Sequence, residues 1–312
     1  MVKGEATMLK KAAVTNKRKI QDPLCDKVLY AVIHTLLILL LIIIGYPLIF
    51  VVSSSFSDPT AVSSGKVVFL PVDFSLKGYE AVFSHKYIML GYRNTIFYTV
   101  TGTLINLAVT LTAAYALYRR ECPFRRFFMI MFTLTMFFSG GLIPGYMQIV
   151  NLGLIDTIWA ILLPGAISVY NMILVRTFLI GGIPNEMLEA TQIDGLSDAG
   201  FFFQMVLPLA KPVIACVTLF YAVGHWNSYF SAMLYLNDIE KQPLQLFLRN
   251  ILVENEIMAN QIQDPKLVAA KQGMSDLLKY SLIIVSSGPI IALYPFIQKY
   301  FIKGVMIGAI KG

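Results

Sequence analysis

Long uninterrupted apolar runs constrain this chain more than any other feature of its sequence. A helix rises 1.5 Å per residue, so about 20 apolar residues cross the roughly 30 Å hydrocarbon core of a bilayer. The runs are continuous and do not alternate in and out, which favours helices over a β-barrel. We therefore predict an all-α integral membrane fold with six transmembrane helices, from the runs at 28–52, 94–117, 127–149, 157–180, 212–236 and 280–302.

The composition agrees with a protein that sits in a lipid bilayer. Of the 312 residues, 57% are hydrophobic and only 14% are charged, whereas about a quarter of the residues in a soluble domain are charged. The chain is therefore too apolar to be read as two soluble domains.

The net charge of +7 predicts a topology and not a nucleic-acid partner. With six spans, the three basic segments lie on one side of the membrane, and the positive-inside rule makes that side cytoplasmic. We expect a basic cytoplasmic tail over 1–27, a transmembrane domain over 28–302 and a cytoplasmic tail over 303–312. The basic residues are Lys3, Lys10, Lys11, Lys17, Arg18, Lys19, Lys27, Arg119, Arg120, Arg125, Arg126, Lys299, Lys303 and Lys311.

The chain lacks the short motifs that carry catalysis. It has no phosphate loop, no dinucleotide fingerprint, no H-E-x-x-H and no G-x-S-x-G. Its three cysteines, Cys25, Cys122 and Cys216, show no disulfide or zinc spacing. We expect no catalysis and no cofactor on this chain. A membrane enzyme would need a reactive cluster, and an ion-coupled transporter would need carboxylates inside its spans.

The segment 181–211, between the fourth and fifth runs, is polar and punctuated by glycine and proline. Pro184 suits the first position of a short helix that runs to Asp194. Gly195 is placed to end that helix in the left-handed conformation, which glycine adopts cheaply. These signals predict a helix, a glycine turn and a second helix.

The second helix of this segment also has start and stop signals. Ser197 can cap its first turn, Pro208 is expected to end it, and Pro212 opens the next span. Carboxylates can then face water, while a set of apolar side chains faces the bilayer or the bundle: Met187, Phe202 and Val206.

The stretch EATQIDGLSDAGFFFQMVLP resembles the loop of ABC importer permeases written E-A-A, three residues, G, nine residues, I-x-L-P. Thr191 replaces the second alanine and Met205 replaces the isoleucine; both swaps keep a compact or apolar character. The resemblance implies that 181–211 docks into an ATPase subunit, with a charged contact and a turn at its centre. The residues expected in this coupling role are Glu189, Ala190, Thr191, Asp194, Gly195, Leu207 and Pro208.

Nearly the whole chain is similar to carbohydrate-uptake permeases related to the smaller maltose permease subunit. The similar runs are 138–165, 225–238 and 298–312, and the branch is the one associated with oligosaccharides such as aldouronates and pectin fragments. This implies a multi-pass protein of the bacterial cytoplasmic membrane. The implied partners are a homologous second permease, two ATPase subunits that hold ATP and Mg, an extracytoplasmic sugar-binding protein and an oligosaccharide. A permease for a non-sugar solute is the alternative.

A sugar pathway needs polar groups and flat aromatic faces, because unpaired hydroxyls are costly to remove from water. The fourth and fifth runs hold such residues near mid-bilayer or at helical spacing. The alternative role of these residues is helix packing and anchoring at the interface. We also expect Arg176 to extend to the inner surface, and Gly141 and Gly145 to allow close packing at a kink. The pathway residues are Tyr170, Asn171, Tyr221, His225, Trp226, Asn227 and Tyr229.

The segment 237–278 is long for an external connection. Leu244, Phe247, Leu248, Ile251 and Leu252 recur at helical spacing and predict an amphipathic helix on the outer surface of the bundle. The polar stretch 260–273 is expected to project outward, and the resemblance implies that it reaches the binding protein. A passive loop is the alternative. The contact residues are Asn260, Gln263, Asp264, Pro265 and Lys266.

Overall fold

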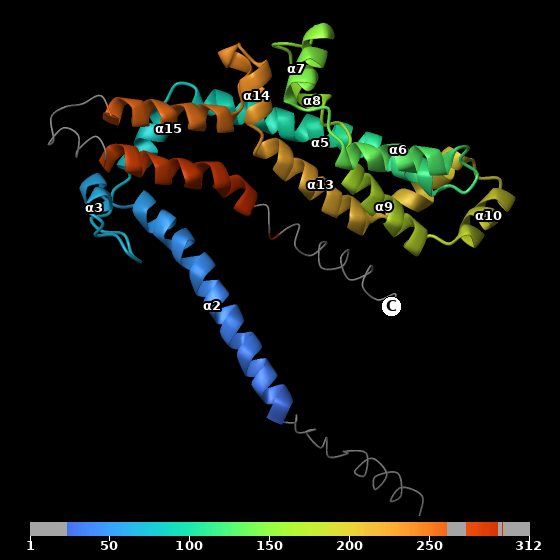
Figure 1. The fold of residues 1–312 in the computed structure, drawn as a ribbon, viewed down its shortest axis with the longest axis horizontal. Coiled ribbons are helices and arrows are strands. Elements are labelled where there is room, and N and C mark those ends of the chain that lie inside the picture. Colours follow the sequence, from blue (N-terminus) through green and yellow to red (C-terminus); the bar gives the residue numbers. More distant parts are fainter. Residues whose placement is uncertain (1–23, 261–272, 293–294, 296–312) are drawn as a thin grey trace, which may run out of the picture. The chain divides into compact units, whose positions relative to one another are not determined.

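The computed structural model describes residues 24–260, 273–292 and 295, and every regular element in these ranges is a helix (Figure 1). The predicted all-α fold is therefore confirmed for this part of the chain. The chain forms two units, Met1–Phe50 and Val51–Gly312.

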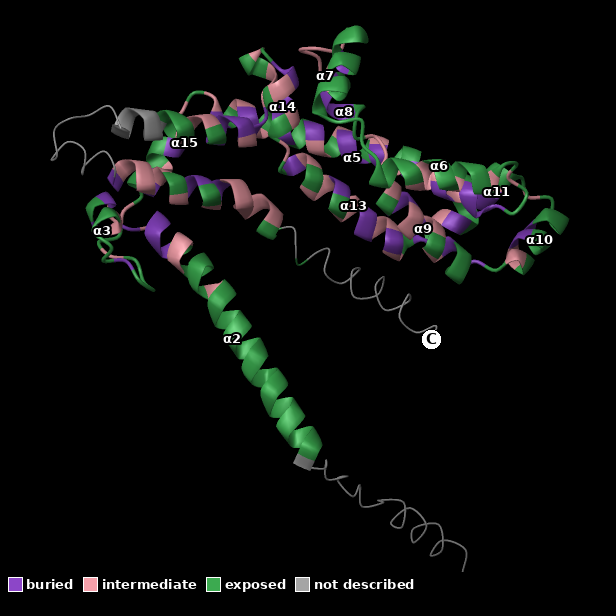
Figure 2. Ribbon diagram, in the orientation of Figure 1, coloured by how far each residue is buried: buried purple, intermediate pink, exposed green. Residues whose placement is uncertain are grey.

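Helix α2 (Leu24–Ser55) contributes most of its length to the first unit. Its large apolar side chains are exposed along most of the helix, with Leu41 and Ile43 among the most exposed (Figure 2). A helix that is apolar all round is stable only when lipid or protein covers it. This helix therefore belongs in a bilayer or against another chain.

The second unit is a succession of helices of very different lengths. In chain order they are α3 (Pro59–Ser63), α4 (Lys77–Ser84), α5 (Ile88–Tyr118), α6 (Arg125–Phe137), α7 (Leu142–Asn151), α8 (Trp159–Leu162), α9 (Val169–Gly182), α10 (Asn185–Ile193), α11 (Asp198–Phe201), the π-helix η1 (Phe202–Val206), α12 (Leu207–Leu209), α13 (Lys211–Trp226), α14 (Phe230–Tyr235), the 3-10 turn η2 (Ile239–Lys241), α15 (Leu244–Asn260) and a helix over Gly273–Ala292.

Three helices in the described part are long and apolar enough to cross a membrane: Cys25–Ser55, Ile88–Tyr118 and Gly273–Ala292. Two further pairs pass the same test but are bent. Arg125–Phe137 and Leu142–Asn151 meet at 115°, and Asp198–Leu209 and Lys211–Trp226 meet at 80°. The described residues thus supply three to five candidate spans, by length and composition.

The runs predicted at 127–149, 157–180 and 212–236 are not single continuous helices, and this corrects the sequence reading. In the first, Gly141 has φ 86° and separates α6 from α7. The residues between α8 and α9 include Pro164, and α13 ends at Trp226. Hydropathy does not register the first two breaks, because glycine and proline interrupt a helix without making it polar.

Helix α5 lies at the centre of the second unit and packs against α9 and α13 (Figure 1). One buried cluster joins the end of α5 to the segment 181–211. It includes Leu117, Tyr118, Met172, Val175, Leu179, Ile183, Leu188, Phe201, Phe202, Val206, Val213, Val217 and Tyr221. The segment 181–211 is therefore built onto the core of the unit.

The segment 237–278 is helical over most of its described length. Leu244, Phe247 and Leu248 are buried on α15, and Ile251 and Leu252 pack beside them, so the predicted amphipathic helix is confirmed. The final helix already begins at Gly273. Asn260 ends α15, whereas Gln263, Asp264, Pro265 and Lys266 lie outside the described residues.

Candidate coupling site

The turn between α10 and α11 is fixed by its backbone. Gly195 has φ 79°, in the left-handed region. The Gly195 N–H donates to the Gln192 carbonyl at 3.0 Å, and the Leu196 N–H donates to the Thr191 carbonyl at 2.9 Å. This pair of bonds is the Schellman arrangement that closes a helix on a glycine. The predicted helix, ending at Asp194 with a left-handed Gly195, is confirmed.

The second helix starts as predicted but continues differently. The Ser197 hydroxyl accepts a hydrogen bond from the Gly200 N–H at 3.1 Å and caps α11. The helix then widens into the π-helix η1 and continues as α12, which contains Pro208. The prediction that Pro208 ends the helix is therefore wrong. A wider turn before proline relieves the clash between its ring and the preceding turn. The break falls at Ala210.

Most of the predicted contact residues are exposed. Glu189, Ala190, Asp194 and Pro208 are open to solvent, Leu207 is half-buried, and only Thr191 is buried. The Thr191 hydroxyl donates to the Leu188 carbonyl at 2.8 Å within α10. Ile193 is 87% exposed and Phe203 is 65% exposed. Exposed large apolar side chains beside carboxylates are typical of a docking surface.

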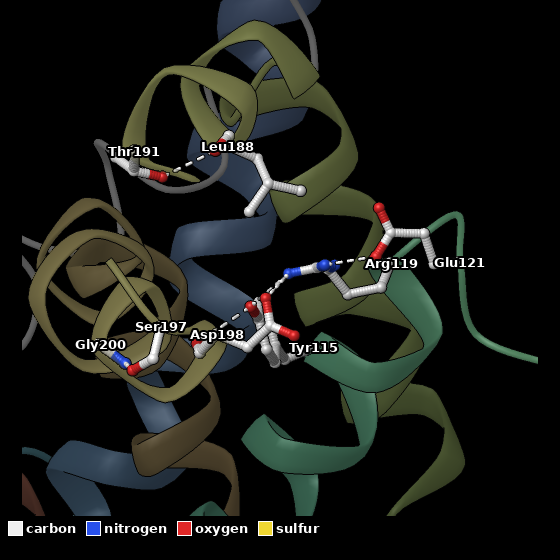
Figure 3. A network of polar contacts seen from close by, with 8 residues as sticks. All are labelled: Tyr115, Arg119, Glu121, Leu188, Thr191, Ser197, Asp198 and Gly200. Carbon is white, nitrogen blue, oxygen red and sulfur yellow. Dashed lines mark hydrogen bonds and ion pairs between the residues drawn. The ribbon is translucent and has the colours of Figure 1, made fainter. Parts of the chain in front are cut away.

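Arg119, directly after α5, makes ionic contacts with this loop (Figure 3). It is only 8% exposed. Its Nη1 donates to Asp198 Oδ1 at 2.7 Å and to the Tyr115 hydroxyl at 3.1 Å, and its Nη2 donates to Glu121 Oε2 at 2.6 Å. The Tyr115 hydroxyl in turn donates to the Asp198 carbonyl at 3.3 Å.

The contacts of Arg119 keep its guanidinium protonated. Burial acts to lower its pKa, but its hydrogen bonds to Glu121, Asp198 and Tyr115 outweigh that effect and raise the pKa above the usual value. The guanidinium therefore stays charged at every pH at which the protein works. Sequence reasoning counted Arg119 only as an inside-facing charge. Its partner Asp198 is 79 residues away, and no local pattern signals the pair.

Two members of the predicted sugar pathway, the buried Tyr221 and the half-buried His225, connect helices in this structure. The Tyr221 hydroxyl lies 2.6 Å from the Thr110 hydroxyl and accepts from the Ser168 N–H at 3.0 Å. The His225 Nε2 lies 2.6 Å from the Asn106 Oδ1. Because the Asn106 amide nitrogen donates to the Gly165 carbonyl, its oxygen is the acceptor, and His225 Nε2 carries the proton.

The other predicted pathway residues do not form one group. Asn171 is buried on α9, and the Trp226 Nε1 donates to the Ser286 carbonyl at 2.9 Å. Tyr170, Asn227 and Tyr229 are exposed. The Asn227 amide donates to the Val223 carbonyl at 3.0 Å, within its own helix end. In this structure Tyr221, His225 and Trp226 thus make contacts between helices, and their role in a sugar pathway stays a prediction.

Two smaller sequence expectations concern Arg176 and the glycines at the kink. Arg176 is half-buried, and its Nε donates to the Leu117 carbonyl at 2.9 Å, next to the end of α5 at Tyr118; its extension to the inner surface stays a prediction. A Cβ atom added at Gly145 would meet nothing within 4 Å. Close packing within the described part of the chain is therefore not the reason for Gly145. The kink is confirmed at Gly141.

Comparison with known families identifies the class. The model of the family "Binding-protein-dependent transport system inner membrane component" matches residues 88–307. The chain belongs to this family, as its sequence motifs had suggested. It is a permease subunit of an ABC importer, an inner-membrane transport component and not a catalytic one.

Individual relatives cover nearly the whole chain. The Polygalacturonan/rhamnogalacturonan transport system permease protein YtcP of Bacillus subtilis strain 168 is 38% identical, over 90% of this chain and 97% of its own. Protein LplC of the same organism is 39% identical, over 85% and 89%. The crystal structure of a bacterial ABC transporter involved in the import of the acidic polysaccharide alginate is similar with a TM-score of 0.79 and 34% identity, over 89% of this chain and 98% of that chain.

Proposed function

We propose that this permease imports oligosaccharides that carry uronic acids. The observation that carries the proposal is similarity over nearly the whole chain to proteins named for polygalacturonan and alginate transport. Both polymers bear a carboxylate on their uronic acid units. A matched pair of ligands tests the proposal: oligogalacturonides, and neutral galacto-oligosaccharides of the same length and linkage.

Uptake of both labelled ligands is measured in cells with and without this chain. Uptake of the acidic oligomer that requires this chain, at least tenfold above uptake of the neutral one, is the expected result. Equal uptake of the two oligomers, or uptake of the neutral oligomer alone, contradicts the acidic substrate class. No uptake of either oligomer by cells that hold the assembled transporter contradicts it as well.

The surface of α10 and its turn is proposed as the docking site of an ATPase subunit. Glu189 offers a charge and Ile193 an exposed apolar side chain, and the Gly195 turn holds the two helices at a fixed angle. Acidic and apolar groups side by side fit a partner with a basic rim and an apolar groove. Two such loops, one from each permease, would let a closing ATPase pair move both halves of the transporter.

Two variants test this docking proposal. Glu189→Lys should repel a basic partner, and Gly195→Pro forbids the left-handed turn. Both should reach the membrane and lose uptake. The exposed Glu80 on α4 provides a matched charge reversal, Glu80→Lys, that should transport normally. Normal uptake by both loop variants at normal abundance removes this assignment.

We infer six membrane crossings with both ends of the chain in the cytoplasm. The three to five spans of the described part and the basic segments around 1–27 and 119–126 support this topology. A single cysteine at Lys27 or at the exposed Arg126 should react only with reagents that enter the cytoplasm. Labelling of either position from outside in intact cells contradicts the topology.

The stretch 260–273 is proposed to contact the docked binding protein. It follows α15, whose apolar face is packed on the bundle, and it carries Asp264 and Lys266 among mostly polar residues. The segment 237–278 is long for a connection in a compact bundle, and long connections are often functional.

A further inference from the structure

Three consecutive residues at the end of α5 each bond to a different part of the predicted coupling loop. The Tyr118 hydroxyl donates to the Ile183 carbonyl at 2.9 Å, just before α10. Arg119 binds Asp198 at the start of α11. With the Asn185 amide oxygen turned toward Arg120, that oxygen accepts from Arg120 Nε at 3.0 Å and Nη2 at 2.9 Å.

We propose that residues 118–120 form a brace that makes the coupling loop and α5 move as one body. The proposal rests on the proposed docking function of the loop. Arg119 acts as a positioning residue, because it holds the start of the second loop helix. Arg120 holds the start of the first, at Asn185. Tyr118 fixes the entry to the loop at Ile183, just before the first helix.

Burial separates this brace from an ordinary inside-facing charge. An arginine that only obeys the positive-inside rule would keep its guanidinium in water, as the exposed Arg126 on α6 does. The Arg119 side chain is 9% exposed, although its two carboxylate partners are 69% and 68% exposed. Withdrawing a charge from water toward exposed partners gains little stability. The arrangement instead fixes a geometry, in which one planar fork joins two carboxylates on different segments.

Apolar contacts make the same connection continuous. The Tyr115 and Phe202 rings lie with centroids 4.9 Å apart, and Leu117 and Tyr118 share a buried cluster with Phe201. Deeper along α5, Asn106 and Thr110 bond to His225 and Tyr221 of α13. Packed side chains and hydrogen bonds therefore connect the loop to α5 and then to α13, so that a displacement of the loop would also displace these helices. Such a contiguous network is a physical route for coupling.

The test uses the assembled transporter in lipid vesicles, with its ATPase, partner permease and binding protein. The measured quantity is sugar transported per ATP hydrolysed, alongside assembly and total ATPase rate. Arg119→Gln should assemble and hydrolyse ATP, while sugar per ATP falls by roughly 2- to 30-fold, the range for mutations along a coupling network. Arg126→Gln removes an exposed arginine from the same region and should leave the ratio unchanged.

A double-mutant cycle shows whether Arg119 and Asp198 act as one unit. If they do, Arg119→Gln with Asp198→Asn lowers sugar per ATP no further than Arg119→Gln alone. Arg119→Lys keeps the charge but cannot hold two carboxylates in one plane, so its ratio should fall between wild type and Arg119→Gln.

A wild-type ratio of sugar to ATP in the Arg119→Gln transporter that does assemble overturns the brace, even where less of it assembles. If Arg119→Gln does not assemble at all, Arg120→Gln decides, because that side chain is exposed. A lowered ratio then supports the brace, and a wild-type ratio overturns it. Glu189→Lys and Gly195→Pro are measured in parallel: normal transport by both variants would contradict the docking function itself, whatever the arginine variants do.

Discussion

The glycine of the α10–α11 turn allows a quantitative prediction, because only one physical effect acts there. A Cβ atom at Gly195 would meet nothing within 4 Å, so added volume costs nothing. The backbone conformation does cost free energy, because φ at this position is 79°. An L-residue held in the left-handed conformation loses roughly 1–2 kcal/mol, a factor of roughly 5–30 in the population of this turn. Gly195→Ala should therefore weaken transport without abolishing it.

Other substitutions at the same position should follow the same backbone rule. Asparagine tolerates the left-handed region better than alanine, so Gly195→Asn should transport more than Gly195→Ala. Proline has φ fixed near −65° and no N–H, so Gly195→Pro loses both the turn and the bond to the Gln192 carbonyl. The expected order of uptake is glycine, asparagine, alanine and, far below, proline.

A matched control exists elsewhere in the chain. Gly153 has φ 65° and meets nothing within 4 Å, and its turn has the same two bonds, from Gly153 to Val150 and from Leu154 to Ile149. Gly153→Ala should therefore carry the same backbone cost but leave sugar per ATP unchanged. Uptake, sugar per ATP and thermal unfolding of both alanine variants are the assay. If Gly153→Ala lowers sugar per ATP as much as Gly195→Ala, the loss reflects general stability and the coupling argument fails.

Three further predictions concern other parts of the second unit. A Cβ atom at Gly102 would overlap the His225 ring, so Gly102→Ala should lower the unfolding temperature. Adding His225→Ala should restore part of the loss. No recovery in the double variant would contradict the contact between Gly102 and the His225 ring. Hydrogen bonds from Thr60 lower the pKa of Asp58 below its ordinary 3.8, so Asp58 stabilises the fold above that pH and loses this effect as pH falls through the lowered pKa. The difference in unfolding temperature between wild type and Asp58→Ala should therefore disappear in acid. A difference that persists in acid would refute the assignment. Replacing 260–273 by a Gly/Ser linker should reduce stimulation of the ATPase by sugar-loaded binding protein; wild-type stimulation and uptake would make the stretch a passive loop, and a loss of uptake alone would place it in sugar release.

The local features of the coupling site were predictable because their signals lie within a few residues. Gly195 follows the last turn of α10, and Ser197 precedes the first turn of α11, so each acts on its own neighbours. The apolar face of α15 was predictable for the same reason, since helical spacing alone placed Leu244, Phe247 and Leu248 together.

Features that depend on distant partners could not be read from the sequence. Arg119 meets Asp198 only because α5 and the loop share a core, and His225 meets Asn106 because α5 packs on α13. Polar residues at helical spacing in α13 suggested a pathway, yet the same spacing serves helix packing. Hydropathy also failed at Gly141, because a left-handed glycine breaks a span without changing how apolar it is.

Photo-crosslinking from Ile193 tests most directly the claim that this loop receives the ATPase. Ile193 is 87% exposed on the last turn of α10, so a photoreactive amino acid there should assemble without disturbing the core. A matched probe at the exposed Glu80 reports background. In transporters that still import sugar, the probe at 193 should form an adduct with the ATPase subunit, and the probe at 80 should not. An active transporter whose probe at 193 gives no more ATPase adduct than the probe at 80 would contradict the coupling assignment.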